Sequence, residues 1–256
     1  MPRPVVSKIT RLRPATWLCA AACTMLWACG TAPVAKHING QPFSSGELAQ
    51  SDANRVANLA MRDNLASLSQ ILDKLYKRNP AYWRKTSTMS AEDARNRVMN
   101  AIRAATPLPE VARTSVAALP LAFDPAFEGD RPGTLVYALG TMLMELYGGR
   151  TELYLVHGLD AQRVANASHN VEVAVWMLST KRDAQGRLLM LSNEIGPEAR
   201  NLSFEREFGR IMARLELVAE MSDEKYRRSA ISYMQGMLGA PLLQFIPLGT
   251  VTAAAQ

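Results

Sequence analysis

Apolar residues recur at helical spacing through most of the chain that follows residue 50. One stripe, spaced by four, three, four and three residues, predicts a helix that begins after Ser51 and ends at about Arg78. A second stripe with the same spacing begins at Phe204, directly after Ser203, a residue type that caps helices. Because residues three or four positions apart lie on one face of a helix, each stripe should face a core.

Residues 134–147 form the most apolar segment of this part of the chain, and Gly148-Gly149 follows them. They are apolar on every side of a helix, which is typical of a helix buried at the centre of a bundle. The segment has 14 residues, whereas a helix needs about 20 to span a membrane. We therefore predict a central buried helix that the two glycines terminate.

Two more helices are predicted from their capping residues. Ser90 precedes a helix over 91–105 and forms part of a capping box. Ser222 is expected to cap the last helix, which Gly236, Gly239 and Pro241 should end. Prolines interrupt the chain before the central helix, so we expect at most a short helix at 110–118 there.

The segment 151–192 allows two interpretations. A helical stripe from Val164 to Leu178 begins after Asp160, which could cap it. Alternating β-branched residues within the same stretch instead favour strands, and a turn at 183–186 would then complete a small β-hairpin over 171–192. The helical pattern begins earlier and lasts longer, so we favour the helix and keep the hairpin as the alternative.

The whole pattern predicts a mainly α fold. We expect a single helical domain over 51–248, with about five to six helices around the central apolar helix 134–147. Residues 29–50 are rich in Gly, Pro and Ser without periodicity, which predicts a flexible tether. The apolar residues 242–248 either pack back on the core or expose a patch that needs a partner. Residues 249–256 should form a tail.

The N-terminus has the pattern of an export signal. The first 13 residues carry four basic side chains and no acidic one, and residues 14–35 carry no charge. The sequence Leu26-Trp27-Ala28-Cys29 resembles the lipobox of bacterial lipoproteins. The resemblance implies that residues 1–28 are a signal peptide that is removed, and that Cys29 carries the lipid.

Some features depart from the lipoprotein pattern. Trp27 is bulkier than the residue usual at its position, and Cys23 offers a second, poorer cleavage site. An uncleaved transmembrane anchor over 14–35 and a simple secreted protein are the alternatives. All three place the domain outside the cytosol. Gly30 follows Cys29, and the resemblance to the sorting rule of Gram-negative lipoproteins implies the outer membrane, facing the periplasm.

Removal of residues 1–28 changes what the composition means. The net charge of the whole chain is +6, but four of its 29 basic residues and none of its 23 acidic residues lie in this segment. The remaining chain has 25 basic and 23 acidic side chains, a net charge of +2, which gives no support to nucleic-acid binding. All three cysteines, Cys19, Cys23 and Cys29, lie at or before the cut, so the domain has neither thiol nor disulfide.

Residues suited to catalysis are few. The sequence contains no nucleophile elbow, Walker loop, dinucleotide fingerprint, zincin helix or EF-hand, so we expect neither a cofactor nor a metal. The candidates for an acid–base pair or a metal site are Glu145, His157, His169 and Glu172. Their plain alternative is a role as surface or core residues, and Glu145 could simply pair with Arg150 near the helix end.

Basic and aromatic residues alternate around the end of the first predicted helix. This basic–aromatic cluster consists of Lys77, Arg78, Tyr82, Trp83, Arg84 and Lys85. Outside the cytosol it could contact lipid headgroups, another polyanion or a partner. The alternative is a solvated helix end, where cations suit the helix dipole.

The sequence therefore favours a non-enzymatic interaction or accessory module. The domain would be held on the membrane by its N-terminal lipid and would bind a protein partner in the cell envelope. One alternative is an envelope enzyme that uses the glutamate and histidine candidates. The other is a carrier of an apolar ligand beside the central helix, in a cavity that Met142 and Met144 would line.

Overall fold

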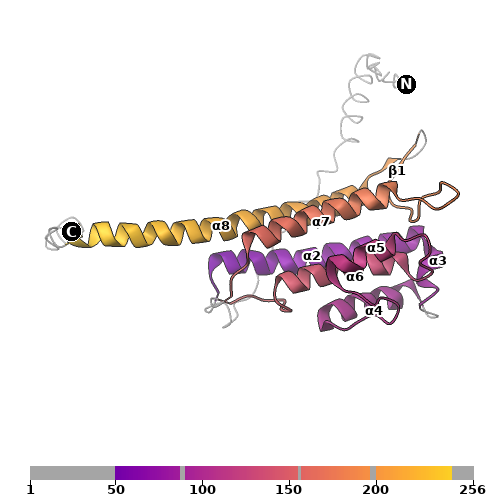
Figure 1. The fold of residues 1–256 in the computed structure, drawn as a ribbon, viewed down its shortest axis with the longest axis horizontal. Helices are drawn as coiled ribbons and strands as arrows, with labels where there is room; N and C mark the ends of the chain where they lie inside the picture. Colours follow the sequence, from indigo (N-terminus) through magenta and orange to yellow (C-terminus); the bar gives the residue numbers. More distant parts are fainter. Residues whose placement is uncertain (1–49, 87–89, 155–156, 197–199, 244–256) are drawn as a thin grey trace, which may run out of the picture. The chain divides into compact units, whose positions relative to one another are not determined.

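The computed structural model describes residues 50–86, 90–154, 157–196 and 200–243 of the 256-residue chain. The described part is a single, mainly α domain, as predicted (Figure 1). Its bundle consists of α2 (Asp52–Arg78), α4 (Ala91–Ala104), α6 (Arg131–Leu146), α7 (Ala161–Thr180) and α8 (Ser203–Leu243). Shorter elements connect these helices: α3 (Pro80–Trp83), η2 (Ser115–Ala118), α5 (Leu119–Ala122), β1 (Glu194–Ile195) and β2 (Arg200–Asn201).

Helix α6 is the central helix that the apolar segment predicted. Every residue from Arg131 to Met144 is buried, and α2, α4, α5, η2 and α7 all pack against it. The carboxylate of Asp130 caps its first turn by accepting a hydrogen bond from the backbone N–H of Gly133, at 3.0 Å. Gly140 lets α4 approach closely, because a Cβ atom there would lie 2.5 Å from the side chain of Ile102.

Helix α2 packs against both α6 and α8, and α7 lies along α8 and also contacts α6 (Figure 1). The hydroxyl of Ser51 caps α2 by accepting a hydrogen bond from the N–H of Asn54. At the other end, the side-chain amide of Asn79 donates to the carbonyl oxygen of Leu191 and accepts from its N–H. This pair of hydrogen bonds fastens the segment before β1 to the end of α2.

The segment that allowed two interpretations is helical up to Thr180. Asp160 caps α7 by accepting from the N–H of Arg163, and the stripe that contains Val164, Val171 and Leu178 is buried. The strand alternative is wrong there because that stripe packs along α8. The predicted turn at 183–186 exists and carries one isolated bridge, Arg182–Leu188, while the two-stranded hairpin of β1 and β2 lies further along the chain.

Helix α8 is continuous where two helices were predicted. Ser222 does not cap a new helix; its hydroxyl donates to the carbonyl oxygen of Val218 at 2.7 Å, as a serine inside a helix does. Helical pairs continue past it, because the carboxylate of Glu224 accepts hydrogen bonds from both Arg227 and Arg228. The glycines and the proline at 236–241 do not stop the helix, which ends at Leu243.

The second half of α8 extends beyond the bundle (Figure 1). Up to Ser222 its apolar face is buried, and from Tyr226 to Met237 every side chain is exposed. None of the helices in the described ranges is long and apolar enough to cross a membrane.

Candidate functional site

Three of the four candidates for acid–base chemistry, Glu145, His169 and Glu172, are exposed. Glu145 lies at the end of α6, and its carboxylate is 3.9 Å from Arg163 rather than paired with Arg150. His169 and Glu172 share one face of α7, with 3.2 Å between Nδ1 and Oε2, and both side chains are about 70% exposed. The pair therefore lies in solvent on the surface of the domain.

His157 has a local structural role. Its Nδ1 atom accepts a hydrogen bond from the backbone N–H of Tyr154 at 3.0 Å. Its carbonyl oxygen accepts one from the side-chain amide of Asn54, which also binds the carbonyl oxygen of Tyr154. These bonds hold the loop before α7 against the start of α2.

The structure does not bring these candidates together. Glu145 lines a hollow of about 180 Å³ with Arg163, Asn166 and Asn170, and neither histidine lines it. No group of three or more His, Cys, Asp or Glu side chains that could hold a metal occurs in the part of the chain that the structure describes. An acid–base or metal site assembled from the predicted residues is therefore not formed in this arrangement.

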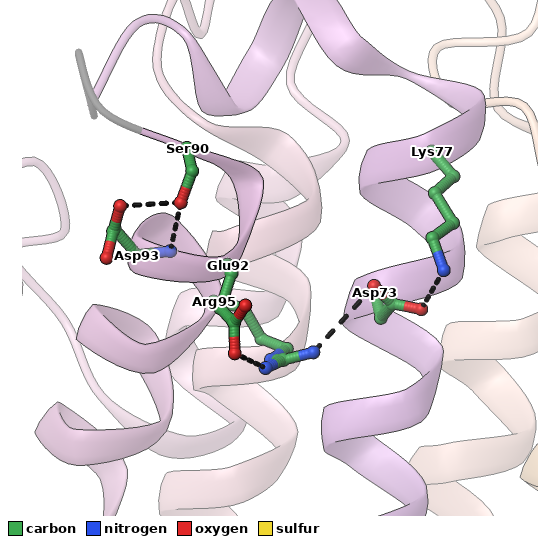
Figure 2. Close-up of polar contacts among 6 residues, drawn as sticks. All are labelled: Asp73, Lys77, Ser90, Glu92, Asp93 and Arg95. Carbon is green, nitrogen blue, oxygen red and sulfur yellow. Dashed lines mark hydrogen bonds and ion pairs between the residues drawn. The ribbon is translucent and has the colours of Figure 1, made fainter.

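Lys77 and Arg78, the first two residues of the basic–aromatic cluster, are paired with acidic side chains. Lys77 lies 2.7 Å from Asp73, whose carboxylate also faces Arg95 of α4 at 3.8 Å (Figure 2). Arg78 binds Glu194 of β1 at 2.9 Å. Part of the positive charge that the sequence suggested is therefore neutralised within the domain.

The rest of the cluster packs against neighbouring segments. The hydroxyl of Tyr82 donates to the carbonyl oxygen of Leu189 at 2.7 Å, and Lys85 donates to the carbonyl oxygen of Glu128. The guanidinium of Arg84 lies 5.0 Å from the ring centre of Trp83. The cluster thus fastens α3 to two other segments, and its role as a patch for polyanions or partners stays a prediction.

A buried polar pair at the start of α6 was not anticipated as a pair. The hydroxyl of Tyr76 donates to the carboxylate of Asp130 at 2.5 Å, and both residues are buried. Burial raises the pKa of the Asp130 carboxyl, although the hydrogen bonds from Tyr76 and Gly133 act in the opposite sense. Burial and the charge of Asp130 also raise the pKa of Tyr76. The pair joins α2 to the cap of α6, which is a structural task.

The space beside the central helix is divided. A hollow of about 250 Å³ is lined by Tyr137, Thr141 and Met144, whereas Met142 lines the hollow of about 180 Å³; Glu145 borders both. Ligand sites usually enclose about 300–1,000 Å³. The two methionines therefore do not share the apolar cavity that a carrier would need.

A larger groove lies where α2 begins and α8 leaves the bundle. Its volume is about 830 Å³. Ser51 and Asp52 line it from α2, and Leu217, Met221 and Arg228 line it from α8. The chain that precedes α2 therefore enters the domain at the end from which α8 projects.

Beyond this groove, α8 exposes a row of large apolar side chains. We call residues 226–243 the distal segment. Tyr226, Tyr233, Met234 and Met237 are 56–70% exposed. The apolar spacing of the first half of α8 continues into this row. The predicted start of a new helix at Ser222 concealed this continuity in the sequence. An exposed row of this size is typical of a contact surface.

The predicted lipidation site Cys29, the signal over 1–28 and the tail 249–256 lie outside the described residues, as does most of the tether 29–50. No protein-family model, curated protein or solved structure matches the chain. The function must therefore be argued from the residues and their geometry.

Proposed function

We propose that this protein is a lipid-anchored lipoprotein of the bacterial cell envelope. Its helical domain would act as a non-enzymatic interaction or accessory module on the periplasmic side of the outer membrane. The N-terminal pattern supports the anchor, since a basic segment, an uncharged apolar run and a lipobox-like sequence follow one another up to Cys29. Several acyl chains on one residue would hold the domain stably on a membrane.

One structural observation supports interaction over catalysis. The distal segment exposes a continuous apolar row in water, while Glu145 and the two histidines lie in separate surroundings. Exposed apolar rows are unfavourable in water and mark surfaces that another component covers. The surface of the distal segment is therefore the part of the domain through which it would act.

Metabolic labelling with palmitate tests the anchor. Cells that express the wild type should incorporate label into the protein, and Cys29→Ala should abolish that incorporation because the acceptor thiol is lost. Cys23→Ala is the matched control and should leave labelling unchanged. The labelled protein should fractionate with the outer membrane.

Two results would contradict the assignment. Unchanged labelling of Cys29→Ala would show that Cys29 is not the lipidated residue. Loss of labelling in Cys23→Ala alone would move the lipid to the competing site.

A further inference from the structure

The charge of α8 changes abruptly along its length. Residues 203–228 contain 12 charged side chains, and residues 229–256 contain none. A helix that pairs with another helix in water hides one face and keeps charged or strongly polar residues on the others. The chain beyond Arg228 lacks charge on every face, so contact with one partner helix would still leave an uncharged outer surface in water.

The apolar face of the distal segment continues the core face of the same helix. Phe208, Leu215 and Val218 are buried within the bundle. At about 100° per residue, Tyr226 and Met237 fall on nearly the same side of α8 as these buried positions. One apolar face thus runs along α8 from Phe204 to Met237. The described part of the domain covers its first half only.

Beyond Arg228, the opposite side of the distal segment carries no charge and holds Ser232, Gln235 and the 39% exposed Ile231. Ser232 and Gln235 project about 150° away from the centre of the apolar face. The result is a helix with an apolar side that needs an apolar medium and a mixed opposite side whose polar residues need water or headgroup contacts. The interface between a lipid bilayer and water offers both along one plane.

The last charged residues lie at the point where α8 leaves the bundle. Glu224 accepts hydrogen bonds from Arg227 at 2.6 and 2.7 Å and from Arg228 at 2.8 Å. These two arginines hold the pKa of the Glu224 carboxyl down to about 2, so this carboxyl stays ionised. Together, the three side chains carry a net charge of +1. A cation at this boundary suits the level of anionic lipid headgroups.

The distal segment also lies at the end of the domain that the tether enters. Ser51, at the start of α2, lines the groove with Arg228, Ser229 and Ser232 of α8. The tether between Cys29 and Ser51 has 21 residues, so it extends over at most about 75 Å. A lipid on Cys29 would therefore keep the distal segment within reach of the same membrane surface.

We infer that the distal segment of α8 is a second membrane contact, which lies in the lipid–water interface with Tyr233 and Met237 toward the acyl chains. This inference rests on the proposed lipid anchor. In this arrangement the segment lies along the bilayer surface. Tyrosine suits this position because its ring is apolar and its hydroxyl is polar.

The inference can be tested on the lipidated full-length mature protein. Because all cysteines lie at or before position 29, Met237→Cys would introduce the one free thiol of that protein. An environment-sensitive fluorophore is attached there, and the protein is reconstituted into vesicles of phosphatidylethanolamine and phosphatidylglycerol that contain a lipid-borne quencher. Met237 is 60% exposed, so the substitution should leave the bundle folded.

Two matched variants provide the comparison. Gln235→Cys places the fluorophore on the polar side of the same segment, and Ser179→Cys places it on the exposed end of α7. Quenching at position 237 should exceed quenching at both other positions at least about threefold, because only that side chain would lie among acyl chains.

Three outcomes would overturn the inference. Equal quenching at 237 and 235 would show that the apolar face does not enter lipid. A disulfide-linked dimer of Met237→Cys that persists on dilution would identify a second copy as the occupant. Protection from a soluble quencher without quenching by lipid would identify a protein partner. A separate control tests the anchor. If the fluorophore labels the protein without an introduced cysteine, Cys29 has a free thiol and the proposed anchor is refuted. The quenching comparison is then made in the Cys29→Ala background.

Discussion

The hydroxyl of Tyr76 and the carboxylate of Asp130 meet inside the domain, 2.5 Å apart. Asp130→Ala would remove the cap of α6 and leave a buried hydroxyl without its acceptor, so we expect a loss of about 2–4 kcal/mol in the free energy of unfolding. Tyr76→Phe removes only the hydroxyl and should lower it by about 1 kcal/mol. Urea denaturation of both variants and of the double variant measures these effects.

The double variant decides whether the two groups act together. If the hydrogen bond matters, the double variant should be less destabilised than the sum of the single variants by about 0.5–3 kcal/mol. Strictly additive losses would mean that the pair contributes no coupling, and that only the cap of α6 matters.

The raised pKa of Asp130 predicts a pH dependence of stability. A carboxyl with a higher pKa in the folded chain stabilises that state below its unfolded pKa of about 3.9, and this contribution is lost as the pH rises through the folded pKa. Asp130→Asn removes the titration but can still cap α6. The stability of the wild type relative to this variant, measured by urea denaturation between about pH 4 and pH 7, should therefore fall as the pH rises above the unfolded pKa of about 3.9. A constant difference across this range would contradict the prediction.

At the level of elements, the crossing of α4 and α6 depends on Gly140. A Cβ atom at this position would lie 2.5 Å from Cδ1 and 2.9 Å from both γ carbons of Ile102. Gly140→Ala should therefore destabilise the domain by about 1–3 kcal/mol through overpacking. Ile102→Val removes the nearest atom, so the combined variant should recover part of that loss in thermal or urea denaturation.

Gly209 in α8 is the matched control for this substitution. Nothing lies within 4 Å of a Cβ atom built there. Gly209→Ala should therefore show only the helix propensity of alanine, a gain of about 0.5–1 kcal/mol. Losses of similar size at both glycines would mean that close packing of α6 against α4 is not the cause.

The helices that the sequence predicted well are those whose apolar stripe meets a neighbour along its full length. The segment of α7 is helical despite its strand-forming β-branched residues, because α8 covers its apolar stripe. The division of α8 at Ser222 was wrong because a serine has two uses in a helix, and only the fold decides between them. Here its hydroxyl bonds to Val218 within an unbroken helix.

Across the whole molecule, the unpredicted features depend on partners far apart in the sequence. Arg78 meets Glu194, and Tyr82 meets the carbonyl oxygen of Leu189, across separations of 116 and 107 residues. Local spacing contains no information on such pairs, so the sequence indicated the basic–aromatic cluster but not the contacts that join it to Glu194 and Leu189. The lipid anchor proposed at Cys29, in contrast, rests on a local sequence motif and needs no tertiary contact to be proposed.

Because α8 is unbroken, the direction in which its buried apolar row faces and the direction in which its exposed apolar row faces are coupled. Its buried and exposed apolar rows share one helical phase, so the side on which the bundle sits determines the side that the distal segment presents. Removing a single residue between Ser222 and Tyr226 would turn the exposed row by about 100° around the axis while the bundle stayed as it is. Because the helix is continuous, the surface that binds the exposed apolar row of the distal segment also fixes the orientation of the bundle relative to that surface.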